Sequence, residues 1–254
     1  MQFEKFNKTV EAIEKNLGEI TEEIILLQQT QTSILRNDYY LVKDKDTQAV
    51  FESVLKKNQK KSAPNNHLKA YDFMHADNKI SVKSGQIKDK KLKFSYSRTT
   101  EHITLNNKIE YLAKFDNLIL GIASEKVPSK NENIICKTHY YLYYFPADLI
   151  NIKDMDWKET SSCWKGKDLI NDINIDIVKK MSDQPWILLP TNLISCRKIL
   201  TATVGSNKNR KYLIIDRFDK NERIYFDVYD QRKKIRSLKG MKKCTQFTTK
   251  NAMG

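Results

Sequence analysis

The chain of 254 residues is 40% hydrophobic, which excludes a disordered chain and allows one large domain or a core with an accessory lobe. Lysine and arginine number 45 against 31 acidic residues, which gives a net charge of +14. This excess favours a polyanionic partner, nucleic acid first and an anionic membrane surface second.

The N-terminal segment MQFEKFNKTVEAIEKNLGEI is charged throughout and so lacks the apolar core of a secretory leader. No apolar run in the sequence approaches the length of a membrane span. The four cysteines are far apart and form no CxxC pair, which argues against a zinc site and a disulfide framework. We therefore expect a soluble, cytoplasmic protein with no membrane segment.

The clearest periodicity in the sequence lies in residues 3–34. Apolar residues recur there at steps of three and four, namely Phe3, Phe6, Val10, Ile13, Leu17, Ile20, Ile24, Leu27 and Ile34. This heptad pattern predicts a long helix within an N-terminal helical region, residues 1–46. The helix either lies on the core of its own chain or pairs with a second copy to form a dimer.

A catalytic core is predicted for residues 47–146. It begins with a helix at 47–60, followed by strand-like runs at 68–73, 79–83 and 91–97. The segment SGQIKDKK between the last two runs is interpreted as a hairpin loop that starts at Gly85.

The core continues with one more helix and two strands. The segment RTTEHITLNNKIEYLAKF has an apolar helical face, and the continuous apolar run at 117–124 predicts a buried strand. The aromatic run at 138–146 predicts another strand, ended by Pro146. Helices that follow strands cover a mixed sheet, so the expected class is α/β or α+β.

The remaining segment, residues 147–254, has weaker patterns and is interpreted as an accessory region. A strand is predicted at 185–190, and the runs KYLIIDRFD and ERIYFDVYD predict a hairpin. Residues 231–243 hold seven lysine or arginine residues and no acid, a composition that favours contact with phosphates.

One constellation of residues has the parts of a catalytic site. Asp72 lies near the end of the first predicted strand, and Ser81 and Lys83 lie two apart on the second, so they share a face. A carboxylate there is a ligand for Mg²⁺, and a lysine can orient a water or neutralise charge on a phosphate. Phosphodiester hydrolysis needs these groups. The alternative is that Asp72 and Lys83 form an ordinary ion pair without a catalytic role.

The order of elements over residues 47–145 resembles the core of the PD-(D/E)XK nuclease superfamily, the restriction-endonuclease-like fold. Asp72 matches the first acid of that family's motif, and Lys83 matches its lysine. The stretches ISVKSG and LKFSYSRT are similar to segments of bacterial type II restriction endonucleases. The chain departs from the motif at Tyr71, where the family has proline, and at Ser81, where it has a second acid.

The resemblance implies that another residue supplies the carboxylate missing at Ser81, since some restriction endonucleases carry S-V-K here and take it from the next helix. Glu101 is the preferred candidate, as it lies near the start of that predicted helix, and Glu110 is the second. Glu52 fits the acidic residue that the family often has on its first core helix.

By this resemblance the protein is a type II restriction endonuclease that cuts double-stranded DNA with Mg²⁺ and acts as a homodimer. The accessory region would read the DNA. The candidate DNA contacts are Arg98, Arg197, Asn207, Arg210, Arg232, Lys233 and Lys234. Two alternatives stay open: a non-catalytic nucleic-acid-binding protein, and a repair or recombination nuclease of the same fold without sequence specificity.

Overall fold

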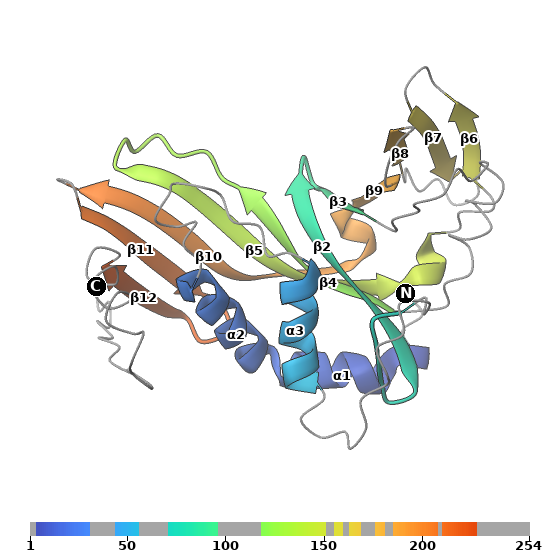
Figure 1. Cartoon of the computed structure of the whole chain (residues 1–254), viewed down its shortest axis with the longest axis horizontal. Helices are drawn as coiled ribbons and strands as arrows, with labels where there is room; N and C mark the ends of the chain where they lie inside the picture. The colour runs from blue at the N-terminus through green and yellow to red at the C-terminus, as the bar shows by residue number, and fades with distance from the viewer. Residues whose placement is uncertain are drawn as a thin grey trace. The chain divides into compact units, whose positions relative to one another are not determined.

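The computed structural model describes residues 4–30, 44–55, 71–95, 118–150, 155–159, 163–168, 176–180, 185–207 and 210–227. They form an α+β fold with a few helices and a large, open, mixed sheet of 12 strands (Figure 1). The strand order is β12-β11-β10-β5-β4-β2-β3-β9-β8-β7-β6, and β1 pairs with β2 outside this path. The expected class with a mixed sheet is confirmed at this level of detail. The helix expected at 98–115 and the basic run at 231–243 lie outside the described residues.

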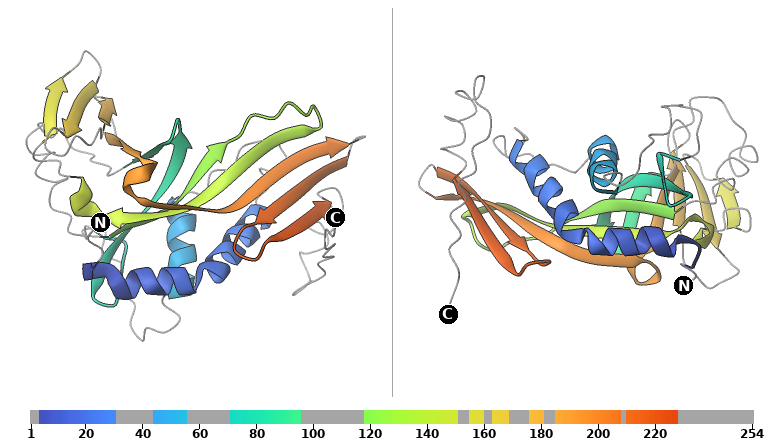
Figure 2. Two further views of the ribbon diagram at one scale, coloured as in Figure 1. Left: turned by 180° about the vertical axis from the view of Figure 1, so that it is seen from behind. Right: turned by 90° about the horizontal axis from the view of Figure 1, so that it is seen from below.

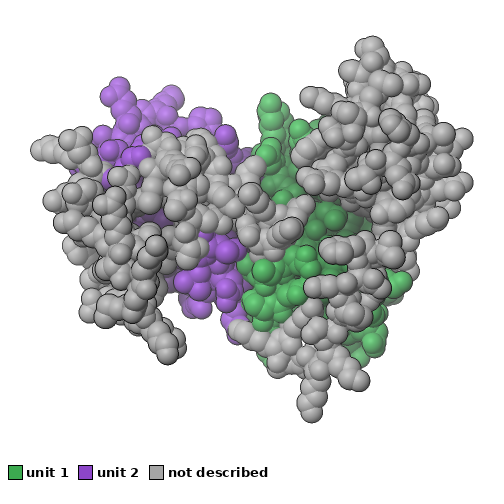
Figure 3. Space-filling view, viewed as in Figure 1, with its two compact units in different colours: residues 1–16, 42–123, 142–197 green, residues 17–41, 124–141, 198–254 purple. Residues whose placement is uncertain are grey.

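The chain divides into two compact units, each assembled from segments that are far apart in sequence (Figure 3). Unit 1 contains residues 1–16, 42–123 and 142–197, and unit 2 contains residues 17–41, 124–141 and 198–254. The division of the sequence into consecutive segments at 46 and 146 stays a prediction.

The N-terminal periodic segment forms two helices instead of the single helix expected. Helix α1 is Asn7–Lys15, preceded by the 3-10 turn Glu4–Phe6, and helix α2 is Leu17–Thr30. The break falls at Asn16, whose side-chain amide donates to the carbonyl of Ala12 at 2.7 Å and so competes with helix continuation. The heptad positions Phe6, Ile13, Leu17, Ile20 and Ile24 are buried in the chain's own core. These side chains therefore pack within the chain itself, as an amphipathic helix requires. The use of this region in a dimer stays a prediction.

Helix α3, Asp44–Leu55, begins earlier than expected and packs against β2 in unit 1 (Figure 1). Its apolar face is formed by four buried side chains, namely Val50, Phe51, Val54 and Leu55. Burial of such side chains stabilises the fold by roughly 1.5–3 kcal/mol each, so this face is sufficient to hold α3 on the sheet.

Three antiparallel strands of unit 1 form a meander as expected: β1 is Phe73–His75, β2 is Asn78–Lys88 and β3 is Lys91–Ser95. The position of the first strand was wrong, because Tyr71 and Asp72 form a bend and Asp72 precedes β1 instead of lying near the end of a strand at 68–73. All pairs are antiparallel, with Phe73 opposite Ile80 and Ile87 opposite Leu92. The predicted loop at 84–91 is wrong for most of its length, because β2 continues to Lys88. Gly85 and Ile87 are buried on the period-two pattern of a strand, and Asp89 and Lys90, both with positive φ, form the turn.

The expected strands at 117–124, 138–146 and 185–190 are confirmed as β4 (Leu118–Lys126), β5 (Ile134–Pro146) and β9 (Pro185–Pro190). Strand β9 pairs with β3, and β8, β7 and β6 follow it in antiparallel order. These three strands, which sequence patterns did not predict, are Met155–Glu159 (β6), Cys163–Asp168 (β7) and Asp176–Lys180 (β8).

In unit 2 the expected hairpin is confirmed as β11 (Arg210–Arg217) and β12 (Glu222–Asp227). Strand β11 also pairs with the long strand β10 (Ser195–Asn207), so the three strands lie side by side in both views of Figure 2. Strand β10 was not predicted from the sequence.

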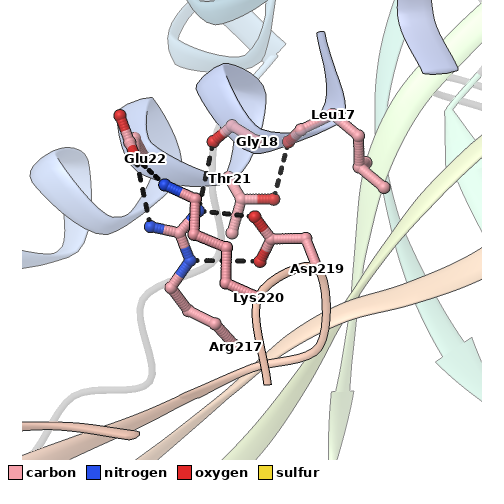
Figure 4. A network of polar contacts seen from close by, with 7 residues as sticks. All are labelled: Leu17, Gly18, Thr21, Glu22, Arg217, Asp219 and Lys220. Carbon is pink, nitrogen blue, oxygen red and sulfur yellow. Dashed lines mark hydrogen bonds and ion pairs between the residues drawn. The ribbon is translucent and has the colours of Figure 1, made fainter. Parts of the chain in front are cut away.

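A network of charged groups joins α2 to the β11–β12 turn (Figure 4). The Arg217 side chain is 4% exposed and pairs with the 6% exposed carboxylate of Asp219. Arg217 also donates to the carbonyl of Gly18 and to Glu22 Oε1, both at 3.3 Å. Lys220 donates to the same oxygen of Glu22 at 2.7 Å. Arg217 therefore links strand, turn and helix through one buried guanidinium.

Candidate active site

The carboxylate of Asp72 lies against the backbone of β2. Asp72 immediately precedes β1, and its amide donates to the carbonyl of Ile80 at 2.8 Å. Its side-chain Oδ2 accepts a hydrogen bond from the amide of Val82 at 2.5 Å. Val82 lies between Ser81 and Lys83, so the hairpin brings together the three residues that the sequence marked as a candidate site. Asp72 is exposed, which leaves its carboxylate accessible to solvent and ligands.

Ser81 and Lys83 lie on one face of β2, and Val82 lies on the other. Ser81 is 8% exposed and Lys83 is half-buried, so only part of this face is open. No ion pair joins Asp72 to Lys83, although the structure describes both residues. The ordinary ion pair considered from the sequence is therefore not formed, and the carboxylate of Asp72 bonds to a backbone amide instead.

The backbone at Lys83 is held by a tyrosine from β5. The hydroxyl of Tyr143, which is fully buried, donates to the carbonyl of Lys83 at 2.6 Å. The tyrosine reaches β2 across Gly121 of β4, where a Cβ atom would lie 1.8 Å from the Lys83 oxygen and 2.5 Å from the tyrosine hydroxyl. Only glycine permits this close approach. The signal for this contact in the sequence is a glycine inside a continuous apolar run.

We expect Tyr143→Phe to lower the free energy of unfolding by about 1–3 kcal/mol, because a buried hydrogen bond to the Lys83 carbonyl is lost. Gly121→Ala should cost more, since its Cβ meets backbone that has no room to move. Urea denaturation of the two variants measures both effects. A Tyr143→Phe protein as stable as the wild type would mean that the hydroxyl contributes nothing to this part of β2.

The turn of the β1–β2 hairpin is fixed to α1 by a fully buried hydroxyl. Thr9 Oγ1 lies 3.0 Å from His75 Nδ1 and accepts from Asn78 Nδ2 at 3.2 Å. Ala76 and Asp77, the two turn residues, both have positive φ. Burial lowers the pKa of His75, so its imidazole stays neutral to lower pH than a solvated histidine. His75 is therefore a half-buried residue that packs between the hairpin and α1.

The donors present fit part of a Mg²⁺ site. Mg²⁺ is commonly held by one or two carboxylates, with waters and substrate oxygens in its other positions. Asp72 supplies one exposed carboxylate, but in the described part of the chain no three His, Cys, Asp or Glu groups lie close enough to hold a metal. Glu52 on α3 is half-buried and accepts from Gln48 of its own helix at 2.7 Å. Glu101 and Glu110 lie outside the described residues.

The candidate DNA contacts are distributed over both units. In unit 1, Arg197 forms a surface ion pair with Glu14 at 3.1 Å, with side chains 54% and 38% exposed. In unit 2, Asn207 is exposed and lies opposite Arg210 at the end of the β10–β11 pair. The other candidates, Arg98, Arg232, Lys233 and Lys234, lie outside the described residues.

No protein-family model, curated protein or solved structure matched this chain. Among the helices that the structure describes, none is long and apolar enough to cross a membrane.

Proposed function

We propose that the protein is a Mg²⁺-dependent endodeoxyribonuclease of the type II restriction class, with a restriction-endonuclease-like core that cuts double-stranded DNA at specific sequences. One observation carries the proposal: the exposed carboxylate of Asp72 is held on the backbone amide of Val82, the residue before Lys83, and forms no ion pair with Lys83. Because Asp72 and Lys83 do not pair with each other, both charges are available to a third group, whereas those of an ordinary ion pair are not.

The roles follow from the chemistry of each group. Asp72 would hold the ion, and Mg²⁺ when bound supplies charge stabilisation at the phosphate and an activated water. Lys83, half-buried and fixed through its own carbonyl, would orient the water or neutralise the charge that develops on the phosphate. Ser81 lines the same face without a charge, so a second carboxylate must come from Glu101, Glu110 or Glu52.

Action as a homodimer belongs to the same proposal. A palindromic duplex has two antiparallel strands related by a two-fold axis, and a symmetric dimer places one active site on each strand. The net charge of +14 supports a polyanionic partner in general.

A second candidate function is a nucleic-acid-binding protein without catalysis. It is favoured by the absence of a three-group metal cluster among the described residues. A third candidate is a nuclease of the same fold without sequence specificity, and the cleavage products separate it from the first.

Incubation of the purified protein with a long duplex of known sequence tests all three. With Mg²⁺ we expect a reproducible set of discrete fragments on a gel, and with a chelator in place of the metal we expect intact DNA. A smear would favour the non-specific nuclease. Binding in a mobility-shift assay without any cleavage, across divalent metals, would favour the non-catalytic protein and contradict our proposal.

A further inference from the structure

The turn between β2 and β3 carries a dense group of positive charges, which we call the lysine hairpin: Lys88, Lys90, Lys91 and Lys93. The only acid among residues 88–93 is Asp89, so four lysines and one aspartate give this segment a net charge of +3. In the pairing of the two strands, Lys88 lies directly opposite Lys91 and Gln86 lies opposite Lys93. The side chains of Lys88, Lys91 and Lys93 therefore share one face of the hairpin with Gln86, and Lys90 lies in the turn.

The pairing of β2 with β3 places two of these positive charges directly opposite each other. Like charges that lie directly opposite each other on paired strands repel, and Lys88 and Lys91 lie so. Within the described part of the chain, Lys88 and Lys90 form no ion pair. A polyanionic ligand would remove the repulsion.

The backbone of the lysine hairpin is fixed by buried side chains and by hydrogen bonds. Its other face is apolar and buried, with Ile87 8% exposed and Leu92 and Phe94 fully buried. The carbonyl of Lys90 accepts hydrogen bonds from the amide and the hydroxyl of Thr191, at 2.9 and 3.0 Å. Strand β9 pairs with β3 along its length. Binding at this surface would thus need little ordering of the backbone.

We propose that the lysine hairpin contacts the phosphate backbone of duplex DNA. The partner rests on the proposed function, but the surface is separate from the candidate active site, because Lys88 lies on the opposite face of β2 from Lys83. Duplex DNA carries one charge per about 1.7 Å of its axis, so several phosphates fall within reach of lysines spaced by about 5–7 Å on paired strands.

An anionic membrane surface fits the hairpin less well. Stable peripheral binding to lipid combines positive charge with apolar side chains that insert into the interface. None of the exposed large apolar side chains among the described residues, which are Leu26, Phe218 and Tyr225, belongs to this hairpin. The exposed part of the hairpin is polar and charged, as contact with phosphates requires.

The test is the salt dependence of DNA binding by the double variant Lys88→Gln/Lys91→Gln. Each lost phosphate contact lowers the slope of log affinity against log salt by about 0.9, so the pair should lower it by about 1.8. Between about 50 and 200 mM salt, the wild type should then lose about twelvefold more affinity than the variant. Fluorescence anisotropy of a labelled duplex gives both slopes.

The matched control removes two exposed lysines from α1, in Lys8→Gln/Lys15→Gln, where Glu11 and Glu14 balance the charge. Its slope should equal that of the wild type. The hairpin variant should be at least as stable to heat as the wild type, because like-charge repulsion is relieved. If it still fails to fold, Lys88→Glu offers an opposite-charge pair with Lys91 and should lower the slope in the same direction.

The outcomes separate this inference from the proposed function. If the wild type cuts DNA and the hairpin variant has the same slope of log affinity against log salt, the inference is wrong and the proposed function is unaffected. A wild type that binds no duplex at any salt concentration would refute the proposed function, and the inference with it. Loss of binding to anionic vesicles of phosphatidylserine and phosphatidylcholine, with duplex binding unchanged, would make a membrane surface the partner and overturn the inference.

Discussion

Replacement of Lys83 by alanine should lower the rate of DNA cleavage by about 10²- to 10⁴-fold, the range that a group acting on the transferred proton or on developing charge contributes. Duplex affinity should change little, because a single half-buried ammonium is a small part of a phosphate-binding surface. Single-turnover cleavage with Mg²⁺ and a separate binding titration in a chelator measure the two quantities independently.

Asp72 allows a sharper test, because two replacements separate its structural and chemical roles. In Asp72→Asn the amide oxygen can still accept from Val82, so the hairpin contact is kept while the negative charge is lost. In Asp72→Ala both are lost. If Asp72 holds a metal, both variants should lose cleavage by about 10²-fold or more, as a removed electrostatic group typically does. If Asp72 only ties β1 to β2, the asparagine variant should cut like the wild type, and the site assignment would be wrong.

Two controls come from the same hairpin. Asp77→Asn makes the same chemical change at an exposed turn residue with positive φ, a conformation that asparagine adopts readily. Lys79→Ala removes an exposed lysine whose ammonium lies 5.7 Å from the centre of the Tyr71 ring. Both variants should cut at nearly the wild-type rate. Losses as large as those of the site variants would mean that any disturbance of the hairpin stops cleavage.

The strands that sequence patterns predicted best are those with continuous apolar or aromatic runs. Strands β4, β5 and β9 are of this kind, and burial of both faces produces the pattern. The predicted end of β2 was wrong because Ser84-Gly85 has the composition of a turn, yet β2 continues through both residues and Gly85 lies opposite Phe94 of β3. The actual turn, Asp89-Lys90, has no glycine, so composition gave little signal for it.

The candidate site was predictable in part. The period of two placed Ser81 and Lys83 on one face, but Asp72 precedes β1 instead of lying near the end of its strand as expected. The hydrogen bond from Val82 to Asp72 depends on the bend at residues 71–72, which no local pattern specifies. The tyrosine that holds Lys83 comes from β5 across β4, and a contact over two strands cannot be read from spacing in a single sequence.

The largest effect on stability should come from Arg217 in unit 2. Its guanidinium and the carboxylate of Asp219 are only 4% and 6% exposed, so Arg217→Met leaves a buried negative charge without its partner. We expect the free energy of unfolding to fall by about 3–5 kcal/mol. Urea denaturation measures it, and the double variant Arg217→Met/Asp219→Asn should recover part of the loss, because the buried charge is then gone as well.

The contribution of this network to the stability of the fold should also depend on pH, and the pKa of Glu22 determines the direction. The hydrogen bond from Lys220 lowers the pKa of Glu22, partial burial opposes it, and the hydrogen bond from Arg217 and both positive charges lower it further. A lowered folded-state pKa stabilises the fold above about pH 4.3, the usual value for glutamate, and this contribution is lost as the pH falls through the lower folded value. Because Glu22 is 52% exposed, screening keeps that contribution small.

Arg223 on β12 is the control for Arg217, since it donates to a carboxylate on the neighbouring strand, Asp216, at 2.5 Å, but is 64% exposed. An exposed pair of this kind contributes about 0.2–1 kcal/mol, so Arg223→Met should change the free energy of unfolding by no more than that. The two arginines have the same chemistry, and they differ in burial. If Arg217→Met and Arg223→Met lower the free energy of unfolding equally, burial of Arg217 does not determine its contribution to stability. The link between α2 and the β11–β12 turn would then not be what stabilises unit 2.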